Sequence, residues 1–454
     1  MSISLRHVAI PDFGPIGAPA PISAKRYAER CDTALRTAGT DWLYVYADRE
    51  HFANVMYLSG FEPRFEEALL LLGSGGRRII VTGNECVSYT SVSPLPDLEV
   101  FLSQTMSLPG QDRTTAPRLD HVLSEIGLKR GDSVGVIGWK YLEAAEWPEE
   151  PRPPFLPAPY LAALQRTVGA DSVVDRTEVL LHPQDGQRSI ISADQIAVFE
   201  GAAARTSQMV WNVIGRIRPG DTERDAALRM NYRGEPVSAH PMLASGDAAG
   251  GPLIGLKSPG WRRINKGDGV STAVGLWGGL TARGGLVEDH DDAFVEVAAA
   301  YFAGLVRWYA TADIDVEGGL IHDEVTGVLS DGGLRSLLNP GHLTGHEEWS
   351  HTPIRPGSSD RIRSGMHMQV DIIPAPMRDG WALNCEDSLV FADRSLRDDL
   401  AQQYPDVWKR ISARRQFLTD TLGVAIADSV LPLSDTPLCL PPLWLRSDHI
   451  LVMD

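Results

Sequence analysis

The amino-acid sequence predicts two domains, an α/β domain at the N-terminus and an α+β domain at the C-terminus. The chain has 454 residues, a length that usually divides into more than one domain. Over roughly the first 150 residues, short apolar runs alternate with helix-like stretches, which is typical of an α/β fold. Farther along, two long helical patterns are interleaved with strand-like segments, which is typical of an α+β fold. We place the boundary so that the domains are 1–185 and 186–454.

The N-terminal domain is predicted to contain a central sheet. Its strands are short apolar runs bounded by Gly, Asp or Arg, at 41–46, 68–72, 79–82 and 133–137. Helical spacing of apolar residues predicts helices at 24–38 and 117–127. The proline-dense stretch 147–159 can form neither a helix nor a central strand, because proline fixes φ and lacks an N–H donor. We interpret this stretch as a surface connection near the domain boundary.

The C-terminal domain is predicted to begin with a long helix. Ser192 and Gln195 have the spacing of a capping box, and apolar residues then recur at helical intervals as far as Ile217. Pro219 and Gly220 end the helix. The other predicted elements are a second long helix at 292–312 and strands near 237–244, 269–275, 366–374 and 381–391.

Composition excludes several classes of protein. The net charge of −17 repels phosphate backbones, so nucleic acid is not an expected partner. No apolar run reaches the roughly 18 residues that a membrane span needs, and the N-terminus lacks the apolar core of a secretory signal. The four cysteines are scattered without a CxxC pair, which argues against a disulfide framework or a thiolate zinc site and fits a cytoplasmic location.

Several short motifs, in order along most of the chain, resemble those of the creatinase, prolidase and aminopeptidase P family. Asn54–Phe61 resembles the family's N-x-x-Y-L-(S/T)-G-F strand, and Gly138–Lys140 resembles its G-W-K motif. Arg188–Ile196 is similar to its R-x-I-K-S-x-x-E-I entry helix, and Ile217–Glu223 to its I-R-P-G-x-T-E turn. Shorter matches follow at Ala244–Gly246, Lys266–Asp268, Thr344–His346, Ser364–Met366 and Glu386–Asp387.

The resemblance implies a fold and an assembly. It implies a creatinase-like α/β domain at the N-terminus and a pita-bread α+β domain of the catalytic type at the C-terminus, with the active site in the latter. Family members with a large N-terminal domain are commonly homodimers, so we expect a homodimer with a small-molecule substrate.

The resemblance also implies a site for two metal ions, held by two Asp, one His and two Glu. This sequence departs from that set at the first two positions, where Ala273 and Leu280 stand in place of Asp. Aliphatic side chains cannot bind a metal, so we expect no dinuclear centre. The other positions correspond to His346, to Asp371 where Glu is usual, and to Glu386. They predict either a metal-free site or a single divalent ion held by these three residues.

Creatinase is a metal-free member of the family that uses a histidine as its acid and base. The matching position in this sequence is Leu253. The resemblance therefore does not predict the hydrolysis of creatine by that route.

The segment 345–351 is unusually rich in titratable residues. It superficially resembles the HExxH motif, but His351 is five residues after His346, about 140° away around a helix, which excludes a zincin site. In an extended segment side chains alternate, so His346, Glu348 and Ser350 would share one side and Glu347, Trp349 and His351 the other.

These residues give a candidate site. His346 is the predicted general acid and base, with Asp371 and Glu386 as orienting carboxylates. The fork of Arg283 suits a substrate carboxylate and an internal carboxylate equally well. The remaining candidates for substrate binding are His240, Glu348, Trp349 and His351.

The sequence leaves three functions open. The first is a hydrolase of a C–N bond in a small amide, amidine or amino-acid derivative, creatinase-like and independent of a dinuclear metal centre. The second is a hydrolase similar to the Xaa-Pro peptidases that uses one divalent ion. The third is a non-catalytic binding protein on the pita-bread scaffold, because a fold can persist after its site is lost.

Overall fold

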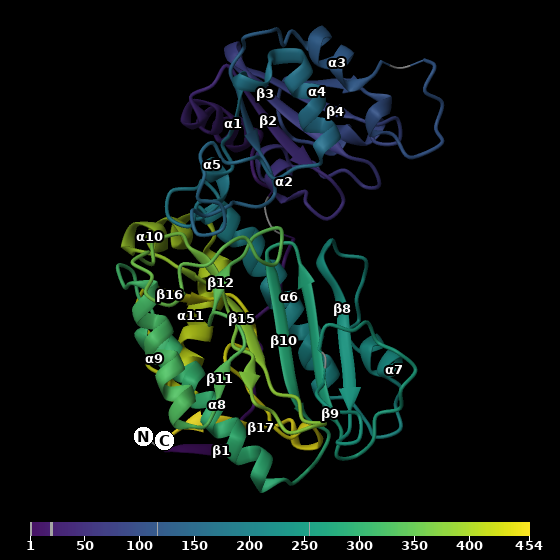
Figure 1. Ribbon diagram of the computed structural model, residues 1–454. Helices are drawn as coiled ribbons and strands as arrows, with labels where there is room; N and C mark the ends of the chain where they lie inside the picture. Colours follow the sequence, from purple (N-terminus) through teal and green to yellow (C-terminus); the bar gives the residue numbers. More distant parts are fainter. Residues whose placement is uncertain (1, 19–20, 116, 254) are drawn as a thin grey trace. The chain divides into compact units, whose positions relative to one another are not determined.

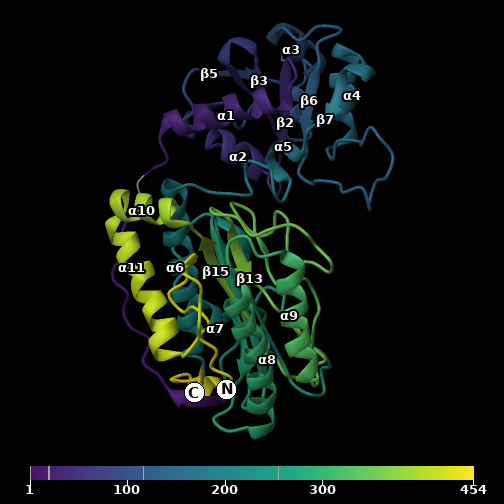
Figure 2. The ribbon, with the colours of Figure 1, turned by 90° about the vertical axis from the view of Figure 1, so that its left-hand side faces the viewer.

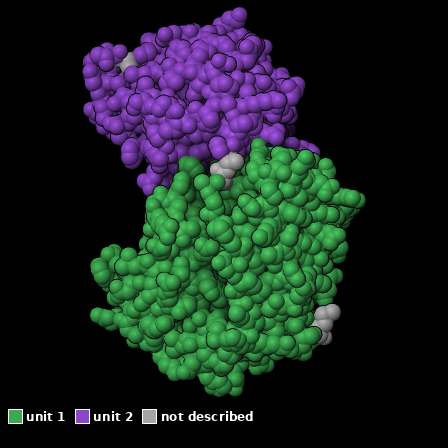
Figure 3. Space-filling model, turned by 180° about the vertical axis from the view of Figure 1, so that it is seen from behind, with its two compact units in different colours: residues 1–20, 190–454 green, residues 21–189 purple. Residues whose placement is uncertain are grey.

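The computed structural model describes residues 2–18, 21–115, 117–253 and 255–454. Two units divide the chain, one of residues 21–189 and the other of residues 1–20 and 190–454 (Figure 3). The first residues of the chain therefore belong with the C-terminal unit, although the predicted division assigned them to the N-terminal domain. The reason is a long-range pairing, because β1 (Ile3–His7) forms an antiparallel ladder with β17 (His449–Met453), which brings the two termini together (Figure 1).

The unit of residues 21–189 is built on a six-stranded sheet with the order β5-β4-β3-β2-β6-β7. Its strands are β2 (Trp42–Ala47), β3 (Ala68–Gly73), β4 (Arg77–Thr82), β5 (Leu98–Leu102), β6 (Val134–Ile137) and β7 (Val173–Asp175). Its helices are α1 (Ala24–Ala38), α2 (Ala53–Ser59), α3 (Leu119–Ile126), α4 (Ala158–Val168) and α5 (Glu178–Leu181). Every residue of β2 and β3 is buried, which explains why these strands are continuous apolar runs. The predicted α/β architecture is confirmed.

Two predictions for this unit were wrong. The segment Asn54–Phe61, compared above with a strand of the family, lies mostly in α2, and this helix is capped by Gly60 in the left-handed conformation. All seven residues of α2 are buried, so the apolar pattern alone could not separate helix from strand. The proline-rich stretch 147–159 is not near a domain boundary, because β7 beyond it pairs with β6 in the same sheet.

The C-terminal unit is built on a seven-stranded antiparallel sheet. The strands run in the order β12-β13-β15-β10-β9-β8, and β16 pairs with β15. They are β8 (Val237–Gly246), β9 (Gly269–Leu276), β10 (Gly279–Leu286), β12 (His342–Leu343), β13 (His367–Val370), β15 (Cys385–Phe391) and β16 (Val430–Pro432). A separate pair is formed by β11 (Arg335–Ser336) and β14 (Pro374–Ala375).

Six α-helices accompany this sheet among the described residues of the unit. They are α6 (Ala193–Ile214), α7 (Glu223–Leu228), α8 (Asp292–Thr311), α9 (Gly318–Asp331), α10 (Arg394–Gln403) and α11 (Pro405–Gln416). Of these, α6 packs directly on β9, β10 and β15. Figure 2 shows α8 and α9 side by side, and α8 buries Phe294, Tyr301 and Trp308 in the main core. The two long helices predicted for this domain are thus confirmed, as is its α+β class.

The capping box lies elsewhere than predicted. Ser192 is the N-cap residue of α6, but its hydroxyl donates to the carboxylate of Asp194 and its side chain caps no backbone N–H. A capping box is present at α7 instead, where Thr222 and Asp225 each accept a hydrogen bond from the other's backbone N–H. In the part of the chain that the structure describes, no helix is both long and apolar enough to cross a bilayer.

Candidate functional site

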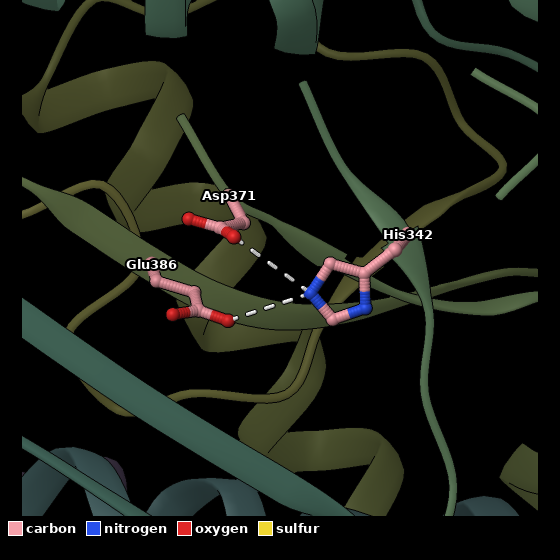
Figure 4. A group of neighbouring side chains, drawn as sticks. All are labelled: His342, Asp371 and Glu386. Atoms are coloured by element: carbon pink, nitrogen blue, oxygen red, sulfur yellow. Dashed lines mark ion pairs between the residues drawn. The ribbon is translucent and has the colours of Figure 1, made fainter. Parts of the chain in front are cut away.

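A histidine and two carboxylates converge where β12, β13 and β15 lie side by side. His342 begins β12, Asp371 follows β13 directly, and Glu386 is the second residue of β15. One potential ligand atom from each residue lies within 4.8 Å of the other two, and Figure 4 shows the three side chains pointing toward one another. All three side chains are buried. We refer to these residues as the His342 cluster.

The imidazole of His342 is held in place by its surroundings. Its ring stacks on Trp349, with centroids 4.1 Å apart and an interplanar angle of 17°. Its Nδ1 lies 3.3 Å from the carbonyl oxygen of Leu343, an acceptor, so Nδ1 carries a proton and donates there. The other nitrogen, Nε2, therefore faces the carboxylates, at 3.1 Å from Glu348, 3.7 Å from Glu386 and 3.9 Å from Asp371.

The charges in the site shift one another's ionisation. Burial alone would lower the pKa of His342, but the carboxylates of Glu348, Glu386 and Asp371 outweigh burial and raise it well above its ordinary value. Burial raises the pKa of Asp371 to about 6, and burial together with Asp371 raises the pKa of Glu386 well above its ordinary value. Burial also acts to raise the pKa of Glu348, but the imidazolium outweighs it and lowers that pKa. The site thus combines an ion pair with two carboxyl groups whose pKa values are both raised.

Two buried atoms of the site have no hydrogen-bond partner among the described residues. They are Nε2 of His342 and Oε1 of Glu386. Nε2 is near three carboxylates, yet none of these contacts has hydrogen-bond alignment. Buried polar atoms are nearly always paired, so these two indicate a position for an ion, a water molecule or a ligand group.

The donor set fits one divalent ion and does not fit two. One imidazole and two carboxylates are a common set for a single metal with positions left open for water. The positions expected for the other Asp ligands, Ala273 and Leu280, pack with Met242 and Ala282 in a small apolar cluster. Within the described residues, the His342 cluster is the one group of His, Cys, Asp and Glu side chains with metal-ligand spacing.

His342, and not His346, belongs to this group. His346 is buried beside the rings of Phe199 and Trp277, with centroid distances of 5.3 and 6.3 Å. The extended conformation assumed for 345–351 is interrupted by a tight reversal, since Leu343 pairs with His351 and the N–H of Gly345 donates to Glu347. His346 therefore sits in the turn, whereas His342 stands on the strand next to β13.

Of the other predicted site residues, two contact the His342 cluster and two lie elsewhere on the sheet or the returning strand. Glu348 and Trp349 do contact the cluster through His342, as described above. His351 lies on the returning strand, where its Nδ1 accepts from the N–H of Thr352. His240 is exposed on β8, which is at the opposite edge of the sheet from β12.

Arg283 pairs with an internal carboxylate and not with a substrate. Its side chain is fully buried, and it donates to both carboxylate oxygens of Asp387, at 3.0 and 2.8 Å. It also donates to the carbonyl oxygens of Cys439, Glu386 and Thr436. The expectation that Arg283 anchors a substrate carboxylate is therefore corrected, because its donor nitrogens are all engaged by acceptors of the protein itself.

Comparison with known proteins identifies the architecture. No family model matches the chain, and no curated protein matches it in sequence. Solved structures do match. A prolidase from Pyrococcus horikoshii OT3 has a TM-score of 0.62 at 16% identity, covering 81% of this chain and 95% of that one. The chain has the pita-bread fold.

Two further pita-bread structures support the same conclusion. Dipeptidase PepE from Mycobacterium ulcerans has a TM-score of 0.60 at 19% identity and covers 82% of this chain and 95% of its own. An X-Pro aminopeptidase from Thermotoga maritima MSB8 has a TM-score of 0.58 at 15% identity, and the match covers 80% of this chain and 95% of that one. Because the matches extend over nearly the whole of these proteins and about four fifths of this chain, they include residues of the N-terminal unit as well as the pita-bread unit that carries the His342 cluster.

Proposed function

We propose that the protein is a hydrolase of a C–N bond in a small amide, amidine or amino-acid derivative, independent of a dinuclear metal centre. The observation that carries the proposal is the His342 cluster, a buried set of acid and base groups with two unpartnered atoms on the pita-bread sheet. The dipeptidases and aminopeptidase with which the chain shares its fold are named for cleaving peptide C–N bonds. A reaction of the same kind is the simplest use of this arrangement.

The residues present provide both proton transfers that such a reaction needs. Asp371, with a pKa of about 6, is largely ionised at neutral pH and can accept a proton from the attacking water. Glu386 retains its proton at higher pH, and it can give that proton to the leaving nitrogen as the C–N bond breaks. The ion pair of His342 with Glu348 orients the imidazole and balances the charge beside these two groups. Water and the amide thereby become a carboxylic acid and an amine.

A second candidate uses one divalent ion at the same residues. It is favoured by the ligand spacing of His342, Asp371 and Glu386. When bound, an ion there would polarise the substrate carbonyl and lower the pKa of a bound water molecule. The third candidate, a non-catalytic binding protein, is supported if a small molecule binds at the cluster and is never consumed.

Metal analysis separates these candidates. We expect protein purified without chelators to contain no more than one divalent ion per chain, because Ala273 and Leu280 offer no ligand for a second. Elemental analysis measures this ratio, and Glu386→Gln is the matched variant in which a single bound ion should be lost. Turnover that survives EDTA supports the metal-free reaction, turnover that requires added Mn²⁺, Zn²⁺ or Co²⁺ supports the single-ion reaction, and two ions per chain would contradict both.

The pKa of Asp371 predicts how stability depends on pH in EDTA-treated protein. Its folded-state pKa of about 6 is above the ordinary value of 3.8, so the folded chain binds an extra proton between these pH values. The contribution of Asp371 to the free energy of unfolding therefore falls as the pH rises from about 4 to about 6. Melting temperatures at pH 4, 5, 6 and 7 should fall more steeply for the wild type than for Asp371→Asn. Parallel profiles would show that Asp371 titrates normally.

The homodimer, the small-molecule partner and the cytoplasmic location remain predictions from the sequence. We propose the homodimer by analogy with the family, and analytical ultracentrifugation tests it directly.

A further inference from the structure

A continuous row of side chains crosses the sheet from the His342 cluster to an apolar patch. Glu386 on β15 is paired with Ala282 on β10, Ala282 with Ala273 on β9, and Ala273 with Met242 on β8. Directly paired residues of antiparallel strands point to the same face, with Cβ atoms about 5 Å apart. The acid group of the proposed reaction and this apolar row therefore share one face of the sheet.

Exposed fractions indicate that this face borders accessible space. Ala273 and Met242 are each 8% exposed, and Glu386 is 7% exposed. The strand neighbours that point to the other face are fully buried, as Val274 and Arg283 show with 0%. Ala282 and Leu280 of the same face are 3% and 4% exposed, so the carboxylate and the apolar side chains all keep a small accessible fraction on this face, whereas Val274 and Arg283 keep none.

The patch is chemically uniform. Leu280 joins Met242, Ala273 and Ala282 in a cluster that is separate from the larger cores of the unit, and the partly buried Ala239 packs against it. None of these five side chains carries a charge or a hydrogen-bonding group. An ammonium group placed against them would lose hydration without gaining a partner, whereas a hydrocarbon group would gain from leaving water.

We propose that Met242, Ala273, Leu280 and Ala282 form a binding site for an uncharged alkyl group of the substrate, which sets the scissile C–N bond beside Glu386. The substrate class is then a neutral amide with a short alkyl substituent and without a cationic amine on that side. The placement of the bond rests on the proposed function. The alkyl site itself is defined by the sheet and does not require turnover.

Binding of an amide series to the wild-type protein tests the site. Dissociation constants of acetamide, propionamide and butyramide, from ligand-observed NMR titration, should fall about threefold to fourfold with each methylene, as the transfer free energy of a methylene implies. The matched probe 3-aminopropanamide replaces the terminal methyl group of butyramide with an ammonium group. We expect it to bind at least about tenfold more weakly than butyramide, because the charge finds no partner there. Equal dissociation constants along the series, or equal binding of 3-aminopropanamide and butyramide, would overturn the proposal.

A pair of variants tests whether the gain in affinity per methylene arises at Leu280. Leu280→Asn keeps the number and branching of the side-chain heavy atoms of leucine and makes the side chain polar, so the gain per methylene should nearly vanish. The control Leu320→Asn makes the same change on α9, where the side chain is 51% exposed, and should leave the gain intact. A gain that persists in a folded Leu280→Asn protein overturns the proposal, and if that variant does not fold, the wild-type series decides.

The outcomes also separate this inference from the proposed reaction. If the amides bind with the expected gain in affinity per methylene but are never hydrolysed, the alkyl site is supported and the proposed hydrolase activity is contradicted. If amides are hydrolysed but neither binding nor hydrolysis depends on the alkyl group, the hydrolase activity is supported and the alkyl site is contradicted.

Discussion

Replacing His342 with glutamine is expected to lower kcat/KM about 10²-fold to 10⁴-fold toward the amide that the wild-type protein hydrolyses best, the range observed when positioned acid–base chemistry is lost. Among the described residues, the imidazolium of His342 is the one positive group that forms ion pairs with Glu348, Asp371 and Glu386. Without it, like-charged carboxylates face each other, their pKa values rise further, and the base is no longer ionised at neutral pH. The loss should therefore be partly recovered at higher pH, which a pH–rate profile would detect.

The matched control is His346→Gln. The sequence motif favours His346 as the acid and base, whereas the geometry favours His342, so the two variants distinguish these assignments. We expect His346→Gln to retain activity within about tenfold, an effect of packing beside Phe199 and Trp277. A large loss in His346→Gln together with a small one in His342→Gln would show that the motif identified the catalytic histidine correctly and that the cluster did not.

Replacing Arg283 with methionine is expected to destabilise the protein by about 3 to 5 kcal/mol, the usual cost of removing one partner of a buried ion pair. Burial raises the pKa of Asp387 even with the guanidinium beside it, so its carboxyl group would be left protonated or unpaired in the core. Arg283 also donates to four buried carbonyl oxygens, and these would lose that donor. Urea or thermal unfolding measures the change.

Two comparisons make this prediction specific. In Arg283→Met with Asp387→Leu both charges are gone, so the double variant should be more stable than Arg283→Met alone. Arg394 on α10 forms an exposed pair with Asp398, and Arg394→Met should change stability little. An Arg283→Met protein as stable as the wild type would contradict the structural role and would reopen a role in substrate binding.

Much of the fold was predictable because it depends on local patterns. The long helices α6 and α8 and the strands β2, β3, β4 and β6 follow from the spacing of apolar residues, which reports the buried face of each element. The prediction failed for α2, where burial on all sides removes the periodic signal. It also failed for β1, whose partner β17 is at the far end of the sequence.

Part of the site was predictable for the same reason. Asp371, Glu386, Glu348 and Trp349 were named from the sequence and lie at or against the His342 cluster. His342 was missed although the sequence carried one signal for it. His342 is two residues before Thr344, so in an extended strand the two side chains point to the same side. Recognising it required the register with β13, in which His342 is paired with Gln369, two residues before Asp371.

By itself, the sequence determined the kinds of most elements, the two-domain organisation and the absence of carboxylates at positions 273 and 280, since these are properties of single residues and their near neighbours. Only the tertiary structure decided which histidine meets the carboxylates, that Arg283 is paired internally, and that the apolar positions continue the row that begins at Glu386. These outcomes depend on strand register and on the tight turn after Leu343. Both arise from contacts between residues far apart in the chain, and a shift of one residue would turn each side chain to the opposite face.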